Sequence, residues 1–238
     1  FVQVPKDSLL DVAYLNERMN SFTFEKATKS TDIAPGTIQW EESEETTHYS
    51  ILDPMGNAVA VTTTLNGSYG SKVFVEKGGY FLNNEMDDFS SKPGAPNMFG
   101  LIGGKANAIA PQKRMLSAMT PTLVERNGKL AMVVGTPGGS TIITSVLQTI
   151  LNVYEFEMDV QSAVSAARFH HQWLPDVVVI EPGRFDPALI KSLQDKAYDI
   201  KEEYSRIIGR VDAIQISDSG EITTGADPRG DDTAVPLF

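Results

Sequence analysis

The alternation of apolar and polar positions changes character at residue 46. Before it, residues 7–22 carry apolar side chains at helical spacing behind a serine or an aspartate that can cap a helix, which predicts one helix. A turn-rich connector follows, and then four glutamates surround Ser43. Such a charge run is typical of a solvated, flexible linker. From Thr46 onward, short apolar runs separated by turn residues predict a folded unit.

The folded unit is expected to group its strands and helices rather than alternate them. Hairpins are predicted where turn residues separate apolar runs, at 48–65, 120–136 and 212–227, and single strands at 79–84 and 177–181. Helices are predicted at 141–156, at 159–169 behind an Asp159 cap, and at 186–198 with a proline in its first turn. The first helix is apolar over most of its circumference, which indicates a buried helix. This order indicates the α+β class, with helices layered on antiparallel sheet in a stacked αββα sandwich.

Composition narrows the classes of function. The 238 residues carry a formal net charge of −11, so nucleic acid and anionic membrane surfaces are unfavourable partners. The absence of cysteine excludes disulfides, thiolate catalysis and cysteine zinc sites. No apolar run is long enough to span a bilayer. The chain begins at Phe1 without a signal segment, so we expect a processed product or a partial chain.

Residues 136–140, TPGGS, join a predicted strand directly to a predicted helix. Gly138 and Gly139 leave backbone N–H groups unshielded at a positive helix N-terminus, where a phosphate or a developing oxyanion can bind. The alternative is a tight strand-to-helix turn with no ligand. The P-loop lysine and spacing are missing, which argues against nucleotide.

The candidate nucleophiles are hydroxyls or lysines. No serine lies in a Gly-x-Ser-x-Gly turn, and His48, His170 and His171 suggest neither a Ser–His–Asp arrangement nor the spacing of a zinc site. A threonine whose own α-amine acts as its base needs no histidine. Such a threonine must be an N-terminus, so the chain must be cut before it.

Acidic side chains and a long loop follow the predicted strand at 79–84. Glu85 and Asp88 can bind an ammonium group, or they can simply cap a turn. The Gly- and Pro-rich segment 89–114 is too long for an ordinary connection, so we expect a lid or a binding loop.

Six blocks of sequence together resemble the γ-glutamyltranspeptidases, in that family's order: TTHYSILDPMGNAVAVTTTLN, LNNEMDDFSSKPG, KRMLSAMTPT, GTPGGSTIITSVLQTI, ARFHHQWLPD and ADPRGDD. The resemblance covers nearly all of residues 46–232. It implies the stacked αββα fold of the N-terminal-nucleophile hydrolases and a precursor that cuts itself into a large and a small subunit. Cleavage would fall between Glu45 and Thr46. Residues 1–45 would then be the C-terminal tail of the large subunit and residues 46–238 the small catalytic subunit.

The resemblance also implies roles for individual residues. Thr46 matches the catalytic nucleophile, and Thr64 matches the second threonine that hydrogen-bonds it. Gly138 and Gly139 match the glycines of the oxyanion hole. Asn66, Glu85 and Asp88 match the residues that bind the α-amino group of the substrate, and Ser117 matches a residue that binds its α-carboxylate. Segment 93–104 matches the lid. The implied partners are a γ-glutamyl peptide, a water or amino-acid acceptor and the rest of the large subunit; the implied location is exported, and no cofactor or metal is expected.

The sequence departs from the family pattern at two positions. Ala118 stands where a second carboxylate-binding serine is common, and Phe99 stands where many relatives with a lid carry a tyrosine. A cephalosporin (glutaryl) acylase and a poly-γ-glutamate transpeptidase or hydrolase remain alternatives within the superfamily. A non-enzymatic binding relative is the alternative from another class.

Overall fold

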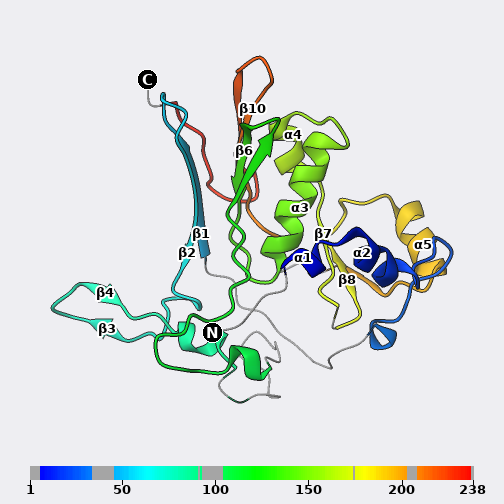
Figure 1. Cartoon of the computed structure of the whole chain (residues 1–238), viewed down its shortest axis with the longest axis horizontal. Coiled ribbons are helices and arrows are strands. Elements are labelled where there is room, and N and C mark those ends of the chain that lie inside the picture. The colour runs from blue at the N-terminus through cyan, green and yellow to red at the C-terminus, as the bar shows by residue number, and fades with distance from the viewer. Residues whose placement is uncertain are drawn as a thin grey trace.

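The computed structural model describes residues 6–33, 46–90, 92, 104–173, 175–202 and 208–236. Its main sheet has four antiparallel strands in the order β11–β10–β6–β5. Their bounds are β5 Thr122–Arg126, β6 Lys129–Gly135, β10 Asp212–Ile216 and β11 Ile222–Gly225. The hairpin of β1 (Thr46–Leu52) and β2 (Ala58–Thr64) packs on one face of this sheet, and the helices α3 (Thr141–Tyr154) and α4 (Val160–Ser165) cover the other (Figure 1).

Smaller elements surround these three layers. A second sheet has the order β7–β8–β9, and β3 pairs with β4 in a hairpin that projects from the body (Figure 1). The bounds are β3 Phe74–Val75, β4 Tyr80–Phe81, β7 Phe169–His170, β8 Val178–Ile180 and β9 Ile200–Glu202. The remaining helices are α1 Lys6–Leu9, α2 Val12–Met19, α5 Pro187–Asp195 and the 3₁₀ turns η1 Ser30–Asp32, η2 Glu85–Asp88 and η3 Lys105–Asn107.

Strand β6 is the centre of the core because it is buried on both faces. All residues from Ala131 to Gly135 are buried. Met132 and Val134 belong to the apolar cluster that includes Ile142 and Val146 of α3. Since side chains alternate along a strand, Val133 faces the opposite way, toward the β1–β2 hairpin, and the backbone of Gly135 is open on that same face. This burial on both sides explains why β6 reads as a nearly continuous apolar run.

A buried charge network joins the end of α4 to the C-terminal segment. Arg168 is 2% exposed and lies 2.7 Å from the Asp227 carboxylate. Its guanidinium also donates to the carbonyl oxygens of Ile208 and Gly209, at 3.0 and 3.1 Å. Asp227 accepts from the Val211 N–H at 2.8 Å. Charges this deeply buried are stable only when each one is paired.

The predicted elements are largely confirmed, including the α+β class and the Asp159 cap, which accepts from the Ser162 N–H at 2.9 Å. The single helix predicted over 7–22 is wrong, because Asp11 caps a separate second helix, α2. The prediction of a buried helix holds for only one face of α3. An opposite stripe, Ile143, Leu147 and Leu151, is 54%, 53% and 38% exposed within the described part of the chain.

We predict that Arg168→Met lowers the free energy of unfolding by about 2–4 kcal/mol. The substitution removes the 2.7 Å ion pair of Asp227, which then keeps its pair with Arg229, and it leaves the Ile208 and Gly209 carbonyls without their guanidinium donor. Urea unfolding followed by circular dichroism measures the effect. The exposed Arg114→Met is the matched control and should change stability by about 0.5 kcal/mol or less. An equal effect of the two substitutions would contradict a structural role for the network.

Candidate active site

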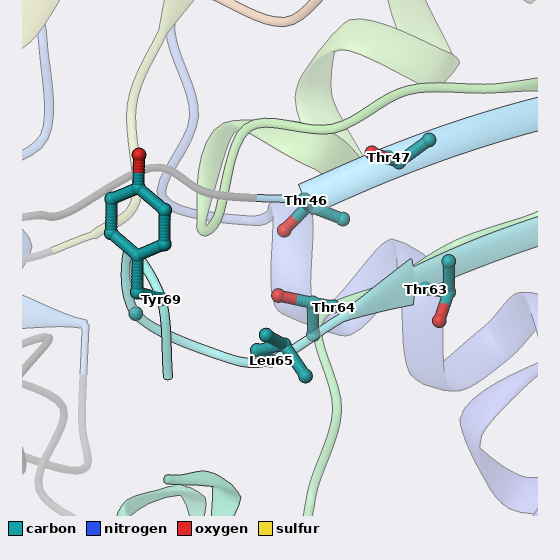
Figure 2. Close-up of a pocket in the computed structure, with 7 residues that line it drawn as sticks. Thr46, Thr47, Thr63, Thr64, Leu65 and Tyr69 are labelled. Carbon is teal, nitrogen blue, oxygen red and sulfur yellow. The ribbon is translucent and has the colours of Figure 1, made fainter. Parts of the chain in front are cut away.

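Two threonines meet at the open end of the β1–β2 hairpin. Thr46 and Thr64 are direct cross-strand partners. Figure 2 shows both hydroxyl oxygens directed into the same open space, with the Tyr69 ring on its far side. This space is a pocket of about 280 Å³, and its lining also includes Thr47, Thr63, Leu65 and Gly67. It is roomy enough for a ligand the size of an amino acid.

Asn66 fixes the turn that follows Thr64. Its N–H donates to the Thr64 hydroxyl at 2.9 Å, and its φ of 75° lies in the left-handed region, which asparagine tolerates better than most residues. Its side-chain amide donates to the Asn84 carbonyl at 3.3 Å. The Asn84 side chain in turn accepts from the Gly67 N–H at 2.9 Å. These bonds connect the threonine pair to the segment that carries the candidate carboxylates.

Glu85 and Asp88 lie on the η2 turn directly after Asn84. Burial, together with the nearby charges of Glu85 and Asp87, raises the pKa of Asp88 to about 6. Burial also raises the pKa of Glu85. Three carboxylates on one turn repel each other, so the cluster favours a cation beside it. Raised carboxylate pKa values in a partly buried cluster are a feature of ligand sites, although structural networks also produce them.

Asn107 links the Asp88 turn to the segment of Ser117, a role that the sequence did not reveal. The Asn107 side chain donates to the Asp88 carbonyl at 2.7 Å and accepts from the Leu116 N–H at 2.9 Å. Ser117 itself is exposed, and its hydroxyl accepts from the Met119 N–H at 3.2 Å. Asn107 lies in a Gly- and Asn-rich loop, where no local pattern distinguishes it from its neighbours.

Gly138 and Gly139 form the turn between β6 and α3, as predicted. Their φ angles are 134° and 52°, so both occupy backbone conformations that favour glycine. A side chain on Gly138 would also lie 3.3 Å from the Cα of Gly209, which packs against the turn. The Thr141 hydroxyl donates to the Gly138 carbonyl at 2.7 Å and fixes that peptide at the start of the helix.

His48 connects the threonine strand to the strand that leads into the glycine turn. A Cβ on Gly135 would lie 2.1 Å from Cε1 of the His48 ring, so the ring packs directly on the Gly135 backbone. The ring nitrogens lie 2.8 Å from the Thr62 hydroxyl and 3.1 Å from the Ser50 hydroxyl. Burial lowers the pKa of His48 to about 4, so the ring is neutral at neutral pH. His48 is therefore a buried residue that bridges β1 and β2.

The adjacent histidines His170 and His171 diverge and contact different partners. His170 is buried beneath the start of α3, where its ring lies 2.8 Å from both the Thr144 hydroxyl and the Gln172 side chain. His171 instead lies 3.2 Å from the Asp176 carboxylate. Within the described ranges, no three histidine, aspartate or glutamate side chains come together as a metal site.

The structure brings Thr46 and Thr64 together in the pocket. Asn66 does not line the pocket but is hydrogen-bonded to Thr64. Glu85, Asp88, Ser117, Gly138 and Gly139 do not line that pocket. Glu45, Phe99 and lid positions 93–103 lie outside the described residues, and Gly104, the last lid position, is exposed. Ala118 is half-buried, and its carbonyl accepts from the Thr120 hydroxyl.

Comparisons with known proteins agree on one family. The gamma-glutamyltranspeptidase family model matches residues 1–237. The glutathione hydrolase proenzyme of Escherichia coli (strain K12) is 45% identical over 232 residues, which cover 98% of this chain and 40% of that protein. The acylase ACY 1 proenzyme of Pseudomonas sp. (strain SE83) is 32% identical over 237 residues, covering 100% of this chain and 39% of that protein.

A solved structure supports the same family. Gamma-glutamyltranspeptidase from Pseudomonas nitroreducens, complexed with L-DON, superposes with a TM-score of 0.75 at 43% identity, over 81% of this chain and 100% of that one. This chain spans about two fifths of the length of the curated relatives named above. The sequence match and the shared fold together establish that the chain belongs to the γ-glutamyltranspeptidase family.

Proposed function

We propose that this chain supplies the catalytic part of a γ-glutamyl transferase and hydrolase that cleaves γ-glutamyl amides such as glutathione. The observation that carries the proposal is that Thr46, the first residue of β1, faces Thr64, the last residue of β2, at a pocket. A residue that begins a strand at the open end of a hairpin can become an N-terminus without loss of the strand. Thr46 can then act as both nucleophile and base.

The proposed maturation is self-cleavage between Glu45 and Thr46. The Thr46 hydroxyl oxygen attacks the Glu45 carbonyl carbon, the C–N bond breaks, and the acyl group moves to oxygen. Water then hydrolyses this ester, leaving a carboxylate on Glu45 and a free amine on Thr46. Residues 46–238 would be the small subunit. They make up about the same share of this sequence as the 81% that is covered when the whole solved chain from Pseudomonas nitroreducens is superposed on it.

In the proposed reaction, the Thr46 hydroxyl attacks the γ-carbonyl carbon of the substrate while the Thr46 amine, directly or through a water, accepts its proton. The Thr64 hydroxyl would orient both groups. The Gly138 and Gly139 amides would stabilise the oxyanion, and the loss of one such donor typically costs about 2.7–4 kcal/mol. The amine product leaves with the proton. Water or an amino-acid amine then releases the γ-glutamyl group from Thr46.

Substrate recognition is assigned to the residues around η2. Asp88 and Glu85 would pair with the substrate ammonium, with Asn66 as a neutral partner, which selects γ-linked over α-linked glutamate. Ser117 would bind the α-carboxylate. With alanine at 118 that contact is reduced, so the rest of the large subunit is expected to supply the main carboxylate partner. These steps use groups of the protein and water alone.

The acylase alternative has support in the 32% identity to the acylase ACY 1 proenzyme. A glutaryl side chain lacks the ammonium that Glu85 and Asp88 are proposed to bind, so their paired carboxylates favour the γ-glutamyl substrate. Side-by-side rates on γ-glutamyl-p-nitroanilide and glutaryl-p-nitroanilide separate the two functions. Among the described helices, none has the length and apolar character to cross a membrane. An exported location stays a prediction.

We predict that Thr46→Ala abolishes both self-cleavage and turnover, because it removes the hydroxyl that performs both steps. The residual rate on γ-glutamyl-p-nitroanilide should fall by several orders of magnitude, and denaturing gel electrophoresis should show one uncut chain. Thr47→Ala, which removes the neighbouring hydroxyl, should still be cut. A processed and active Thr46→Ala protein would contradict the assignment of the nucleophile.

We predict an acid limb in the pH profile of kcat/KM with its midpoint near 6. Asp88 must be ionised to bind an ammonium group, and its pKa is raised to about 6, so kcat/KM should rise with pH through that value and then level off. Asp88→Asn should flatten this limb and raise KM roughly tenfold or more, because it leaves a charged substrate group unpaired.

Asp87→Asn is the matched control for this prediction, since it neutralises a neighbouring carboxylate on the same turn. It should keep the acid limb and shift its midpoint to lower pH, because the Asp87 charge helps to raise the Asp88 pKa. An unchanged KM and an unchanged limb in Asp88→Asn would remove Asp88 from the site.

A further inference from the structure

Residues 27–32 are docked on the folded unit, although the sequence indicated only a turn-rich connector there. Ser30, in the η1 turn, is 2% exposed. Its N–H and its hydroxyl donate to the two separate oxygens of the Asp176 carboxylate, each at 2.8 Å. A carboxylate that accepts two hydrogen bonds from one residue holds that residue in a single orientation.

The third polar group of Ser30 is also bound by the folded unit. The Trp173 indole N–H donates to the Ser30 carbonyl at 2.9 Å. Three residues earlier, the Ala27 N–H donates to the Lys196 carbonyl at 2.8 Å. The His171 ring lies 3.2 Å from Oδ1 of the same Asp176 carboxylate, the oxygen that also accepts from the Ser30 hydroxyl. The bonds of Ser30 and Ala27 each join a residue before 46 to a residue after 46, and the His171 contact supports their acceptor from within the folded unit.

The electrostatics of Asp176 agree with a binding role. Burial raises the pKa of Asp176, but the hydrogen bonds from Ser30 and His171 outweigh burial and hold the pKa below its ordinary value. The carboxylate is therefore charged at neutral pH, and hydrogen bonds to a charged acceptor are stronger than neutral ones.

The preceding helices contribute much less to the docking. No residue of α2 is buried, and Leu10, Val12 and Met19 are 76%, 69% and 57% exposed. Ser30 is the one buried residue in the described part of the segment before Thr46. Within these ranges, attachment to the folded unit is concentrated at residues 27–30.

We propose that Ser30, Trp173 and Asp176 form a clamp that keeps the N-terminal product bound to residues 46–238 after the bond before Thr46 is cut. The inference rests on the proposed self-cleavage, since the clamp matters only in a cut chain. The partner surface is the 171–176 loop, and the ligand is a short segment that presents a serine N–H, hydroxyl and carbonyl together. The product of cleavage therefore stays in place as a bound subunit tail.

The test separates the clamp from self-cleavage by cutting the chain externally. A recognition sequence for a site-specific protease is placed between Glu41 and Glu45 of the whole chain, in a Thr46→Ala background. After the cut, gel filtration and native mass spectrometry follow the release of the N-terminal fragment. In the parent the fragment should remain bound, and in Asp176→Ala its dissociation rate should rise roughly tenfold to a hundredfold.

Ser30→Ala is the second variant, and it cannot disturb the folding of residues 46–238 once the chain is cut. It should accelerate release less than Asp176→Ala does, because the residue 30 N–H still donates to the carboxylate. Thr31→Ala is the matched control, since Thr31 is exposed and, among the described residues, its hydroxyl bonds to its neighbour Asp32. Rapid release from the parent, or equal retention in the parent and both clamp variants, would overturn the proposal. If the fragment is retained after the external cut, but the protein with Thr46 intact does not cleave itself, the result counts against the proposed function and not against the clamp.

Discussion

The β1–β2 hairpin can present Thr46 to a pocket only because it packs on strand β6, and one contact sets how closely the two approach. Gly135 has no side chain, so the His48 ring rests on its backbone. The ring also bridges two hydroxyls on β1 and β2. His48 lies two residues after Thr46, and Gly135 lies three residues before Gly138. A single neutral imidazole thus fixes the strand that begins at Thr46 and the glycine turn at the same end of the sandwich.

The local elements could be predicted from the sequence because each has a local cause. Asn127–Gly128 adopts the positive φ angles of a tight hairpin, and Asp159 caps a helix through its own side chain. The split of the N-terminal helix also has a local cause, since the Asp11 side chain accepts from the Tyr14 N–H and caps α2. The exposed stripe on α3 depends instead on what covers that surface. An apolar pattern marks a face as buriable and carries no information about which segment buries it.

The residues of the candidate site also divide into those that the local sequence predicts and those that depend on distant contacts. The threonine pair and the glycine turn are encoded in contiguous motifs, so their places in the fold were accessible from the sequence. Asn84 and Asn107, which connect the pocket turn to the carboxylates and to Ser117, act through long-range backbone contacts. Asparagines in loops are common, and nothing in the nearby sequence separates a positioning asparagine from a turn residue. The docked Ser30 is the same case, because its partner Asp176 lies 146 residues away.

The central claim is that Thr46 becomes an N-terminal nucleophile, and a peptide map after reaction of the whole protein with L-DON tests it most directly. L-DON is the compound present in the solved Pseudomonas nitroreducens relative. The account predicts a peptide that begins at Thr46 and carries the added mass on that threonine, with no label in Thr46→Ala. Label on another residue, or a labelled chain that still runs through the Glu45–Thr46 bond, would contradict it.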